Sequence, residues 1–422
     1  MNQSKTISQA YELARMQYEA LGVDTEAALS RLRPFEISLH CWQADDVGGF
    51  EHPDASLGGG GIAVTGNYPG KARTIEELRT DLEKVMSLLP GTQRLNLHAS
   101  YGEFGEGFVD RDQIEPAHFQ GWIQWARAQN TALDFNCTCF SHPKADSGFT
   151  LSSKQEDIRR FWVEHARRCR AIGAEMGQQL GKTCIHNIWI PDGSKDITVN
   201  RAMHRELLVE SLDAILEKPF PKQHLIDTVE GKLFGIGSES FTTGSYDFSL
   251  GYAVKRNTGL CLDIGHFHPT ESVADKISAV LQFIDEILLH ITRGIHWDSD
   301  HIVLMNDPVI ELMQEVVWAG ALDRVCFGLD YFDASVNRVG AYVIGIRAAQ
   351  KALLAALLSP LKKLREYERE RRYFERLALL EEMKTLPLGD VWNYFCVLNN
   401  VPPAERYIGE ISRYEREVLT KR

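Results

Sequence analysis

Short apolar segments alternate with longer amphipathic stretches along most of this chain. The apolar segments are rich in β-branched and aromatic residues and end in turn residues, which is typical of buried β-strands. We expect strands at 34–42, 94–100, 132–140, 182–190, 224–232, 258–266, 286–293 and 323–332. Helical periodicity between them indicates helices at 75–89, 115–129, 154–179, 199–217, 270–287 and 306–320. This alternation predicts an α/β fold, a (β/α)8 TIM barrel with its helices outside.

The pattern changes after residue 335. Four helical stretches follow at 336–360, 361–386, 387–399 and 404–420, and Pro360 ends the first of them. The second is dense in charge, and a solvated helix face is the simplest explanation of those charges. We expect two parts: a TIM-barrel catalytic domain at 1–335 and an additional helical C-terminal region at 336–422. Helical tails of this kind often make subunit contacts, so we expect this region to serve oligomerisation.

A polar residue stands at or near the carboxyl end of every predicted strand. In chain order these residues are His40, His98, Asn136, Asn187, Glu230, Asp263, His290 and Asp330. A TIM barrel builds its active site at the carboxyl ends of its strands. The sequence therefore predicts one polar site at that end of the barrel.

The last four strand ends and the segment "HWDSDH" are rich in metal-binding groups. These are Glu230, Asp263, His266, His290, Asp298, Asp300 and Asp330. Five carboxylates at a half-buried site would repel one another unless divalent cations neutralised them. Oxygen donors with one imidazole per ion suit Mn²⁺, Mg²⁺, Co²⁺ or Zn²⁺, and two ions sharing one carboxylate would use all seven groups. Singly, each acid is better explained as a helix cap or a salt-bridge partner, so the interpretation depends on their joint occurrence.

The spacing of these residues also fits shared ions. Asp298 and Asp300 stand two residues apart, so on an extended segment both side chains point the same way. Asp263 and His266 stand three apart, and a tight turn past the strand can bring both to one ion. We therefore expect Asp298 and Asp300 to hold a cation above the barrel mouth.

Composition and charge exclude several other classes of protein. The net charge is −12, with a pI of about 5.7, so neither a nucleic acid nor an anionic membrane surface is an expected partner. No apolar run reaches the roughly 18 residues that span a bilayer, and the N-terminus has no apolar stretch of a secretory signal. The eight cysteines are scattered, and Cys137-Thr-Cys139 lacks a second pair for zinc. We expect buried free thiols and a cytoplasmic enzyme.

A glycine-rich stretch, "SLGGGGIAVTGNYPG" (56–70), follows the first predicted strand. No Lys-Ser or Lys-Thr follows its glycines, so it is not a phosphate-binding P-loop. We expect a mobile active-site loop.

The candidate residues lie within long motifs, "VEGKLFGIGSESFTTGS", "LCLDIGHFHPTESVADKISA", "WDSDHIVLMND" and "GLDYFDASVNRVGAYVIG". Together with "NIWIPDGSKD" and "RLALLEEMKTLP", these motifs closely resemble L-rhamnose isomerase, and the resemblance covers essentially the whole chain. The resemblance implies a TIM-barrel aldose–ketose isomerase that interconverts L-rhamnose and L-rhamnulose. It also implies two divalent cations per subunit, Mn²⁺ ahead of Zn²⁺, Co²⁺ or Mg²⁺, and a homotetramer.

The resemblance also implies roles for individual residues. It assigns Glu230, Asp263, His290 and Asp330 to a structural cation, and His266, Asp298 and Asp300 to a catalytic cation, with Asp263 a candidate for sharing. Lys232 matches the lysine that meets the substrate carbonyl oxygen. His98 and Trp189 match positions in the substrate pocket, and Trp42 resembles an aromatic residue that packs against the sugar.

The isomerisation moves a proton between two oxygens and a hydrogen from C2 to C1. A cation on both oxygens would polarise the carbonyl group, Lys232 would add charge at the developing oxyanion, and a water oriented by Asp298 or Asp300 would carry the hydroxyl proton. We favour a metal-assisted 1,2-hydride shift, because no carboxylate is left over as the base of a cis-enediol route. His98 is a candidate for assisting ring opening.

Two other functions fit a barrel with a polar mouth. A metal-dependent endonuclease would need a basic DNA-binding face, which a net charge of −12 disfavours. A non-catalytic sugar-binding protein would have no use for seven converging metal ligands. Isomerase activity that responds to EDTA would distinguish the enzyme from both.

Overall fold

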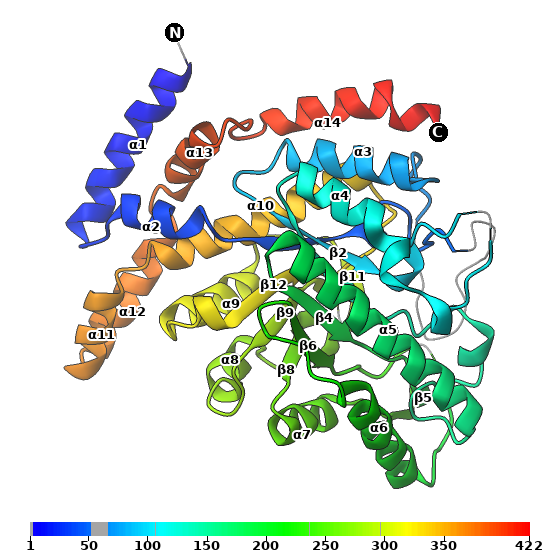
Figure 1. Cartoon of the computed structure of the whole chain (residues 1–422). Coiled ribbons are helices and arrows are strands. Elements are labelled where there is room, and N and C mark those ends of the chain that lie inside the picture. Colours follow the sequence, from blue (N-terminus) through cyan, green and yellow to red (C-terminus); the bar gives the residue numbers. More distant parts are fainter. Residues whose placement is uncertain (1–2, 52–65, 106, 236, 296) are drawn as a thin grey trace.

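The structure, a computed structural model, describes residues 3–51, 66–105, 107–235, 237–295 and 297–422. A closed barrel of parallel strands, in the order β1-β12-β9-β8-β6-β4-β3-β2, forms its centre (Figure 1). The strands are β1 (Ile37–His40), β2 (Arg94–His98), β3 (Ala132–Asn136), β4 (Cys184–Ile188), β6 (Leu225–Glu230), β8 (Gly259–Asp263), β9 (Ile287–Ile291) and β12 (Val325–Leu329). The predicted eight-stranded barrel is confirmed, and each strand lies inside its predicted range.

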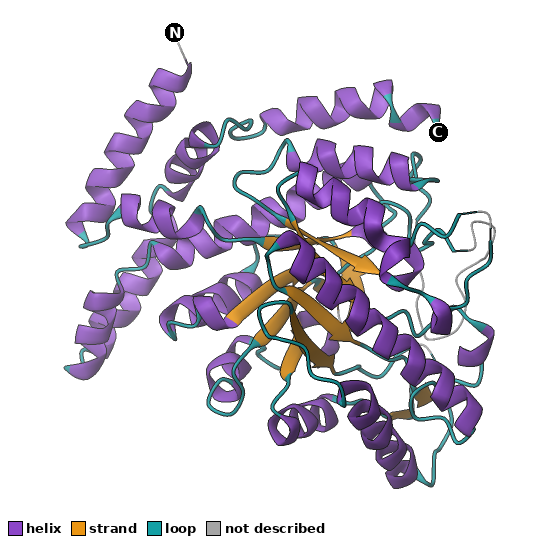
Figure 2. Ribbon diagram, in the orientation of Figure 1, coloured by secondary structure: helices purple, strands orange, loops and turns teal. Residues whose placement is uncertain are grey.

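A helix follows each barrel strand, so that helices surround the barrel (Figure 2). They are α3 (Ile75–Met86), α4 (Gln120–Ala128), α5 (Glu156–Leu180), α6 (Arg201–Leu216), α7 (Tyr246–Arg256), α8 (Ala274–Val280), α9 (Asp307–Trp318) and α10 (Arg338–Leu357). The helix predicted at 270–287 is much shorter in the structure, and α7 is not among the helices predicted above.

The barrel strands are buried on both faces, as their apolar sequences predict. Every residue of β3 and β4 is buried, and α5 packs against both strands. Gly177 allows α5 to approach closely, because a Cβ at this position would lie 1.9 Å from the carbonyl oxygen of His224. The strands therefore have little room to shift, and their carboxyl ends are held in a fixed register.

Two helices precede the barrel, α1 (Gln3–Ala20) and α2 (Thr25–Leu32), and neither is predicted above. α1 packs against α13 (Leu388–Leu398), where the rings of Tyr11 and Tyr394 stack with centroids 3.9 Å apart. The first helix of the chain thus packs against a helix of the C-terminal region (Figure 1).

The predicted C-terminal helices are present. α10 packs against α9, α3 and β1, so it takes the eighth place in the ring of barrel helices. α11 (Leu361–Arg369), α12 (Tyr373–Glu382), α13 and α14 (Arg406–Glu417) follow outside the ring (Figure 1). The predicted boundary at residue 335 lies between the last barrel strand and the helix that completes the barrel. The division into two domains therefore stays a prediction.

Among the described helices, α10 alone is long and apolar enough, by length and composition, to cross a membrane. However, 83% of its most apolar window is buried inside the fold, as in a core helix of a folded domain.

Two small antiparallel ribbons lie outside the barrel sheet. One pairs β5 (Gly193–Ser194) with β7 (Phe241–Thr242), and the other pairs β10 (Arg293–Ile295) with β11 (Trp297–His301). The second ribbon contains the "HWDSDH" segment. The side chains of Trp297 and Asp298 lie outside the described residues, as does the glycine-rich stretch up to residue 65, so the prediction of a mobile loop there is untested.

Candidate active site

The carboxyl ends of the barrel strands open into one pocket. It is lined by Trp42, Val47, His98, Asn136, Phe140, Asn187, Trp189, Glu230, Lys232, His266, His290, Asp300, Asp330 and Phe332. The pocket thus collects most of the predicted site residues from segments that are widely separated in sequence, at the end of the barrel where TIM-barrel enzymes carry their active sites.

Four residues from four neighbouring strand ends form a tight group. The ligand atoms of Glu230, Asp263, His290 and Asp330 all lie within 4.8 Å of one another. Nδ1 of His290 is 3.4 Å from Oε2 of Glu230 and 3.2 Å from Oδ2 of Asp330. These are the residues assigned above to one cation, and the structure brings them together.

The donor set of this group fits a divalent cation. Three carboxylates and one imidazole suit Mn²⁺ and its neighbours. Oδ2 of Asp263 is buried and receives no hydrogen bond from the described residues, an arrangement that is costly unless a cation or a proton satisfies the oxygen. The residues present therefore fit a bound divalent cation.

The ionisation of the group reflects its burial and its crowding. Burial, with Asp330 and Glu230 nearby, raises the pKa of Asp263 well above its usual range. Burial alone would also raise the pKa of Glu230, but the imidazoles of His290 and His266 lower it below its usual range. Asp263 therefore favours its protonated form in this group. A positive charge bound among these carboxylates would lower its pKa again.

A tight turn after β8 places His266 beside Glu230, while the shared binding of one ion by Asp263 and His266 stays a prediction. Asp263 Oδ1 accepts a hydrogen bond of 2.6 Å from the backbone N–H of Gly265 and so caps the 3-10 turn η6 (Ile264–His266). Nδ1 of His266 then lies 3.0 Å from Oε1 of Glu230. His266 can therefore serve a second cation that adjoins the first.

Asp300 reaches the pocket from the β10–β11 ribbon rather than from a barrel strand. Its φ of +44° is left-handed, so the backbone departs there from regular extended geometry. The alternation of side chains along an extended segment therefore cannot place Asp298 relative to Asp300. With the side chain of Asp298 outside the described residues, the joint grip of the two aspartates stays a prediction.

Lys232 lies in the pocket and is 8% exposed. Its Nζ is 5.4 Å from the ring centroid of Trp189. The backbone passes close to Tyr246 just before Lys232. Only glycine fits at position 231, because a Cβ there would lie 2.8 Å from the Cα of Tyr246. The Glu-Gly-Lys sequence thus directs a carboxylate and an ammonium group into the same pocket.

Trp42 and His98 form an aromatic wall of the pocket, with ring centroids 4.8 Å apart. Nδ1 of His98 lies 3.2 Å from Oγ1 of Thr138. Burial and the positive charge of Arg111 lower the pKa of His98 to about 3. His98 is therefore neutral near pH 7 and can exchange hydrogen bonds with a sugar without adding charge.

Several pocket residues are absent from the predicted set of site residues. Asn187 donates a hydrogen bond to Oε2 of Glu230 and is itself held by Thr228, whose Oγ1 donates to its Oδ1 at 2.8 Å. Asn136, Phe140 and Phe332 also line the pocket. Both asparagines are among the strand-end residues expected at the polar site, although the sequence assigned neither of them a role. His40, by contrast, is buried against Tyr331, with ring centroids 4.3 Å apart, and is not a pocket residue.

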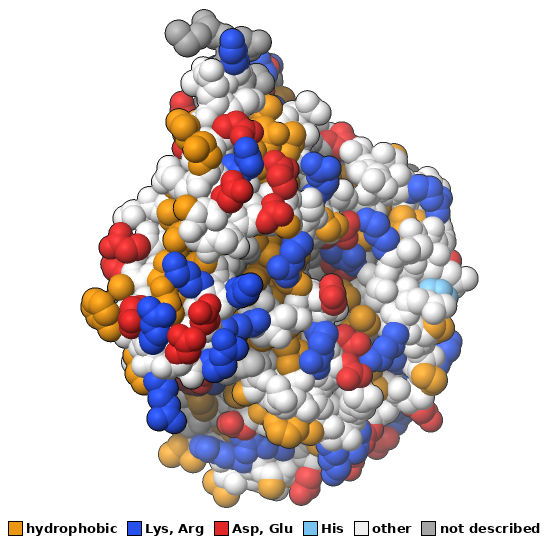
Figure 3. Space-filling view, turned by 90° about the vertical axis from the view of Figure 1, so that its left-hand side faces the viewer, with side chains coloured by type: hydrophobic (Ala, Val, Ile, Leu, Met, Phe, Trp, Pro, Cys, Tyr) orange, Lys and Arg blue, Asp and Glu red, His pale blue; other side chains and the backbone are white. Residues whose placement is uncertain are grey.

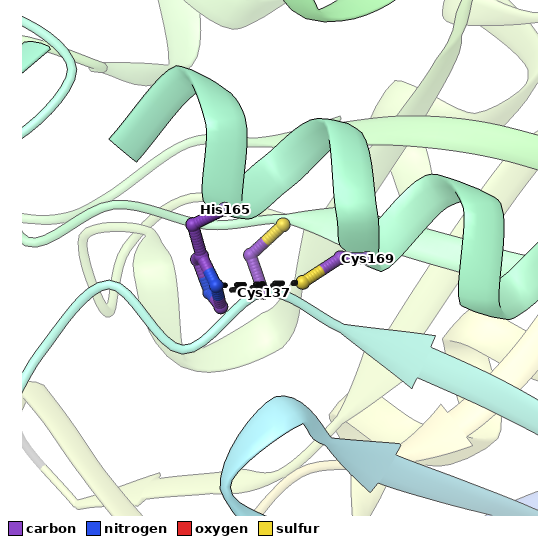
Figure 4. Close-up of side chains that lie close together, drawn as sticks. All are labelled: Cys137, His165 and Cys169. Atoms are coloured by element: carbon purple, nitrogen blue, oxygen red, sulfur yellow. Dashed lines mark hydrogen bonds between the residues drawn. The ribbon is translucent and has the colours of Figure 1, made fainter. Parts of the chain in front are cut away.

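A second buried cluster, Cys137, His165 and Cys169, has metal-like spacing (Figure 4). Both ring nitrogens of His165 already have backbone partners. Nε2 accepts a hydrogen bond of 3.0 Å from the N–H of Thr138, and Nδ1 lies 2.9 Å from the carbonyl oxygen of Arg111. The lone pair of Nε2 accepts this hydrogen bond and is not available to a metal ion. The cluster is better explained as two buried thiols packed on a structural histidine. All eight cysteines are free, as expected.

The eight-stranded (β/α) barrel with carboxylates, imidazoles and a lysine at its mouth is typical of a TIM-barrel enzyme, here with a candidate metal site. The family model "L-rhamnose isomerase (RhaA)" matches residues 5–422. The chain belongs to the L-rhamnose isomerase family.

Relatives match over nearly the full length of the chain. It is 56% identical to the L-rhamnose isomerase of Bacteroides thetaiotaomicron over 422 residues, which is all of both chains. It is 55% identical to that of Rhodopirellula baltica, over all of this chain and 98% of the relative. It is 51% identical to that of Salmonella paratyphi B, over 99% of each chain.

Proposed function

We propose that this enzyme interconverts L-rhamnose and L-rhamnulose and depends on two divalent cations per subunit, with Mn²⁺ preferred. The main support is the group of Glu230, Asp263, His290 and Asp330, which shares one pocket with Lys232. The names of the full-length relatives support the choice of sugar.

The proposed cation sites adjoin each other. Glu230, Asp263, His290 and Asp330 would hold one ion, and His266, Asp298 and Asp300 the other, with Asp263 a candidate for sharing. A bound divalent ion would supply Lewis acidity toward the oxygens at C1 and C2 of the sugar. The 3.0 Å approach of His266 to Glu230 supports two neighbouring sites.

Lys232 would stabilise the negative charge that develops on the substrate oxygen. Its ammonium group is largely shielded from solvent, and a fixed charge acts more strongly there than in bulk water. Trp189 packs against the ammonium group and restricts where it can point.

His98 and Trp42 would bind and orient the sugar. A neutral His98 can accept or donate a hydrogen bond at the ring oxygen or the anomeric hydroxyl group and so assist ring opening. The rings of Trp42, Trp189 and Phe140 offer apolar faces for the C–H groups and the methyl group of a 6-deoxy sugar.

The hydrogen transfer would be a 1,2-hydride shift, in which hydrogen leaves C2 with its electron pair and bonds to C1. In the proposed assignment, the pocket carboxylates are committed to cations, so none is left to act as a free base. Conversion of L-rhamnose deuterated at C2 tests this step. Retention of deuterium at C1 of the ketose supports the shift, whereas exchange with solvent contradicts it.

Activity itself is tested by a ketose assay on L-rhamnose, with and without EDTA. We expect rhamnulose to accumulate only in the absence of chelator. D-Glucose is a suitable control sugar, because it carries a hydroxyl group at C6 and differs in configuration. No ketose from L-rhamnose in Mn²⁺-loaded protein would contradict the proposal.

We further propose a homotetramer in the cytoplasm, with the C-terminal helical region in subunit contacts. Support comes from exposed apolar side chains on α12, where Phe374 is 80% and Leu377 is 68% exposed. Leu13 and Met16 on α1 are also exposed. Figure 3 views this side of the molecule and shows hydrophobic side chains among charged ones. The free cysteines agree with a reducing compartment.

A further inference from the structure

We propose that Asp333 and His301 form a positioning pair that holds Asp300 at the pocket. Neither residue belongs to the pocket lining or to the predicted cation ligands. The inference rests on the proposed function, because Asp300 is assigned there to the catalytic cation.

Asp300 needs support from outside its own strand. It is carried on β11, which in the described part of the chain pairs with the short β10 rather than with the barrel sheet and packs against η6. The pairing has a register shift between Arg293 and Ile295. The left-handed backbone of Asp300 (φ +44°) is also unfavourable for a non-glycine residue. Neither the barrel ladder nor intrinsic backbone preference fixes this side chain in the pocket.

The residue after Asp300 supplies a link to the barrel. Nδ1 of His301 lies 3.4 Å from Oδ2 of Asp333, at the long end of the hydrogen-bonding range. The His301 side chain is 30% exposed, whereas that of Asp333 is 6% exposed. The pair thus connects a half-exposed ribbon to a buried carboxylate.

Asp333 is itself fixed from two further directions. Its Oδ1 accepts hydrogen bonds from the N–H of Ser335 at 3.0 Å and from its Oγ at 2.5 Å. The side-chain amide of Gln43 bonds the backbone of Asp333 on both sides: Nε2 donates to its carbonyl oxygen, and Oε1 accepts from its N–H, both at 2.8 Å. With Oδ1 committed to Ser335, Oδ2 is the oxygen that faces His301.

These contacts connect the ribbon to the part of the barrel that carries the cation group. Gln43 is buried on η1 (Cys41–Gln43), directly after β1. Its neighbour Trp42 donates to Asp330 at 3.1 Å, so one short turn positions both Asp330 and Asp333. Asp333 also contacts His301, the residue next to Asp300, and so connects this turn to the β10–β11 ribbon. The Asp333–His301 contact is therefore one link that sets the position of Asp300 relative to Asp330, beside the packing of β11 against η6.

The test uses both members of the pair. Asp333→Ala removes the acceptor, His301→Ala removes the donor, and His301→Asn keeps an N–H near the position of Nδ1. Asp110→Ala is the matched control, because Asp110 also accepts a nearby backbone N–H, from Arg111, and also contacts a histidine, His142 Nε2 at 3.1 Å, outside the pocket. Each full-length protein is chelated, then titrated with Mn²⁺ while free Mn²⁺ is followed by electron paramagnetic resonance. Tm and the kcat for L-rhamnose are measured in parallel.

We expect both alanine variants to weaken one class of Mn²⁺ sites by about 10–100-fold and to lower kcat by a similar factor, since partners that orient metal ligands have effects of this size. The second class of sites should stay close to wild type, as should the Tm of His301→Ala, whereas Asp333→Ala should also lower the Tm because it removes the acceptor of the Ser335 hydrogen bonds. His301→Asn should recover most of the affinity, and Asp110→Ala should bind Mn²⁺ as the wild type does.

Three results would overturn the positioning role. They are wild-type Mn²⁺ affinity in both alanine variants, equal impairment of His301→Asn and His301→Ala, and an equal effect of Asp110→Ala. Wild-type protein that binds no Mn²⁺ but still isomerises L-rhamnose would instead refute the metal dependence of the proposed function, so the two failures can be told apart.

Discussion

Trp42 Nε1 donates a hydrogen bond of 3.1 Å to Oδ1 of Asp330, a residue 288 positions later in the chain. The two residues follow β1 and β12, which are neighbours where the barrel closes. The aromatic wall of the pocket and a carboxylate of the cation group are therefore held by the same contact. In the proposed assignment, this contact couples the binding of the sugar to the binding of the cation.

Removal of divalent cations should abolish isomerase activity. The carboxylates of Glu230, Asp263 and Asp330 lie together with His290, and bound divalent cations would neutralise their crowded negative charge. Dialysis against EDTA, followed by a ketose assay, should show loss of turnover, and added Mn²⁺ or Co²⁺ should restore it. Full activity in thoroughly demetallated protein would refute the two-cation assignment.

Substitution of the ligands assigned to the catalytic cation should abolish turnover and leave the fold near native. His266→Ala and Asp298→Asn act at the rim of the barrel, away from its packed interior. We expect kcat to fall at least tenfold, with little change in circular dichroism or Tm. A variant that keeps more than a tenth of the wild-type kcat would lose its place in the assignment.

Lys232→Met should lower kcat far more than it changes KM. The ammonium charge is most useful once negative charge develops on the substrate oxygen, so its loss should cost on the order of 10²–10³ in rate. Steady-state kinetics across a Mn²⁺ titration measures the effect.

The main alternative role for Lys232 is neutralisation of the carboxylates, and in that case saturating Mn²⁺ would restore the rate. Lys276→Met is a matched control outside the pocket, because the Lys276 Nζ also lies over an aromatic ring, 4.8 Å from the centroid of Tyr246. That variant should retain the wild-type kcat.

Acid should destabilise the fold partly through His165. Burial and the charge of Arg111 lower the pKa of His165 to about 4, below the usual value near 6.5. Between these pH values the unfolded chain binds a proton that the folded chain does not, so stability falls as pH drops through this window. The contribution is on the order of 2–3 kcal/mol.

We expect His165→Gln to reduce the fall in Tm between pH 7 and pH 4.5, measured in EDTA to remove metal release as a cause. Lower stability of the variant at pH 7 is compatible with this, because the test is the difference between the two pH values. The exposed His268→Gln should parallel the wild type. An unchanged pH dependence in His165→Gln would show that His165 does not titrate as described.

Charge on the exposed face of α12 should weaken subunit association. Phe374→Asp with Leu377→Lys removes two large apolar side chains from this surface. Light scattering at micromolar concentration should show a smaller species than the wild type. An unchanged tetramer, or a wild-type monomer, would contradict the role of this region. Glu381→Lys, elsewhere on the same helix, controls for charge alone.

The barrel and much of the site could be predicted from local patterns. Apolar strands with polar ends predicted Glu230, Asp263 and His290 at one rim, because parallel strands in a barrel end on the same side. Asn187 follows the same rule and is among the predicted strand-end residues, but the sequence assigned it no role, because its hydrogen bond to Glu230 is a tertiary contact. Periodicity also predicted most barrel helices, with less accurate ends.

Features that depend on tertiary contacts could not be predicted in this way. The left-handed backbone of Asp300 is not encoded by its neighbours, since only the surrounding structure can hold a non-glycine residue there. The Gln43–Asp333 pair joins residues 290 positions apart, and no spacing rule points to it. The contact between Tyr11 and Tyr394 likewise needs knowledge of which helices meet.

Closure of the barrel between β1 and β12 also determines when the pocket can form. During synthesis, the edge of β1 that later pairs with β12 stays unpaired until Val325–Leu329 have left the ribosome. Long-range parallel pairing of this kind folds slowly, and exposed strand edges favour aggregation. During synthesis the pocket therefore cannot be complete before β12 is available, and refolding yield should fall with protein concentration.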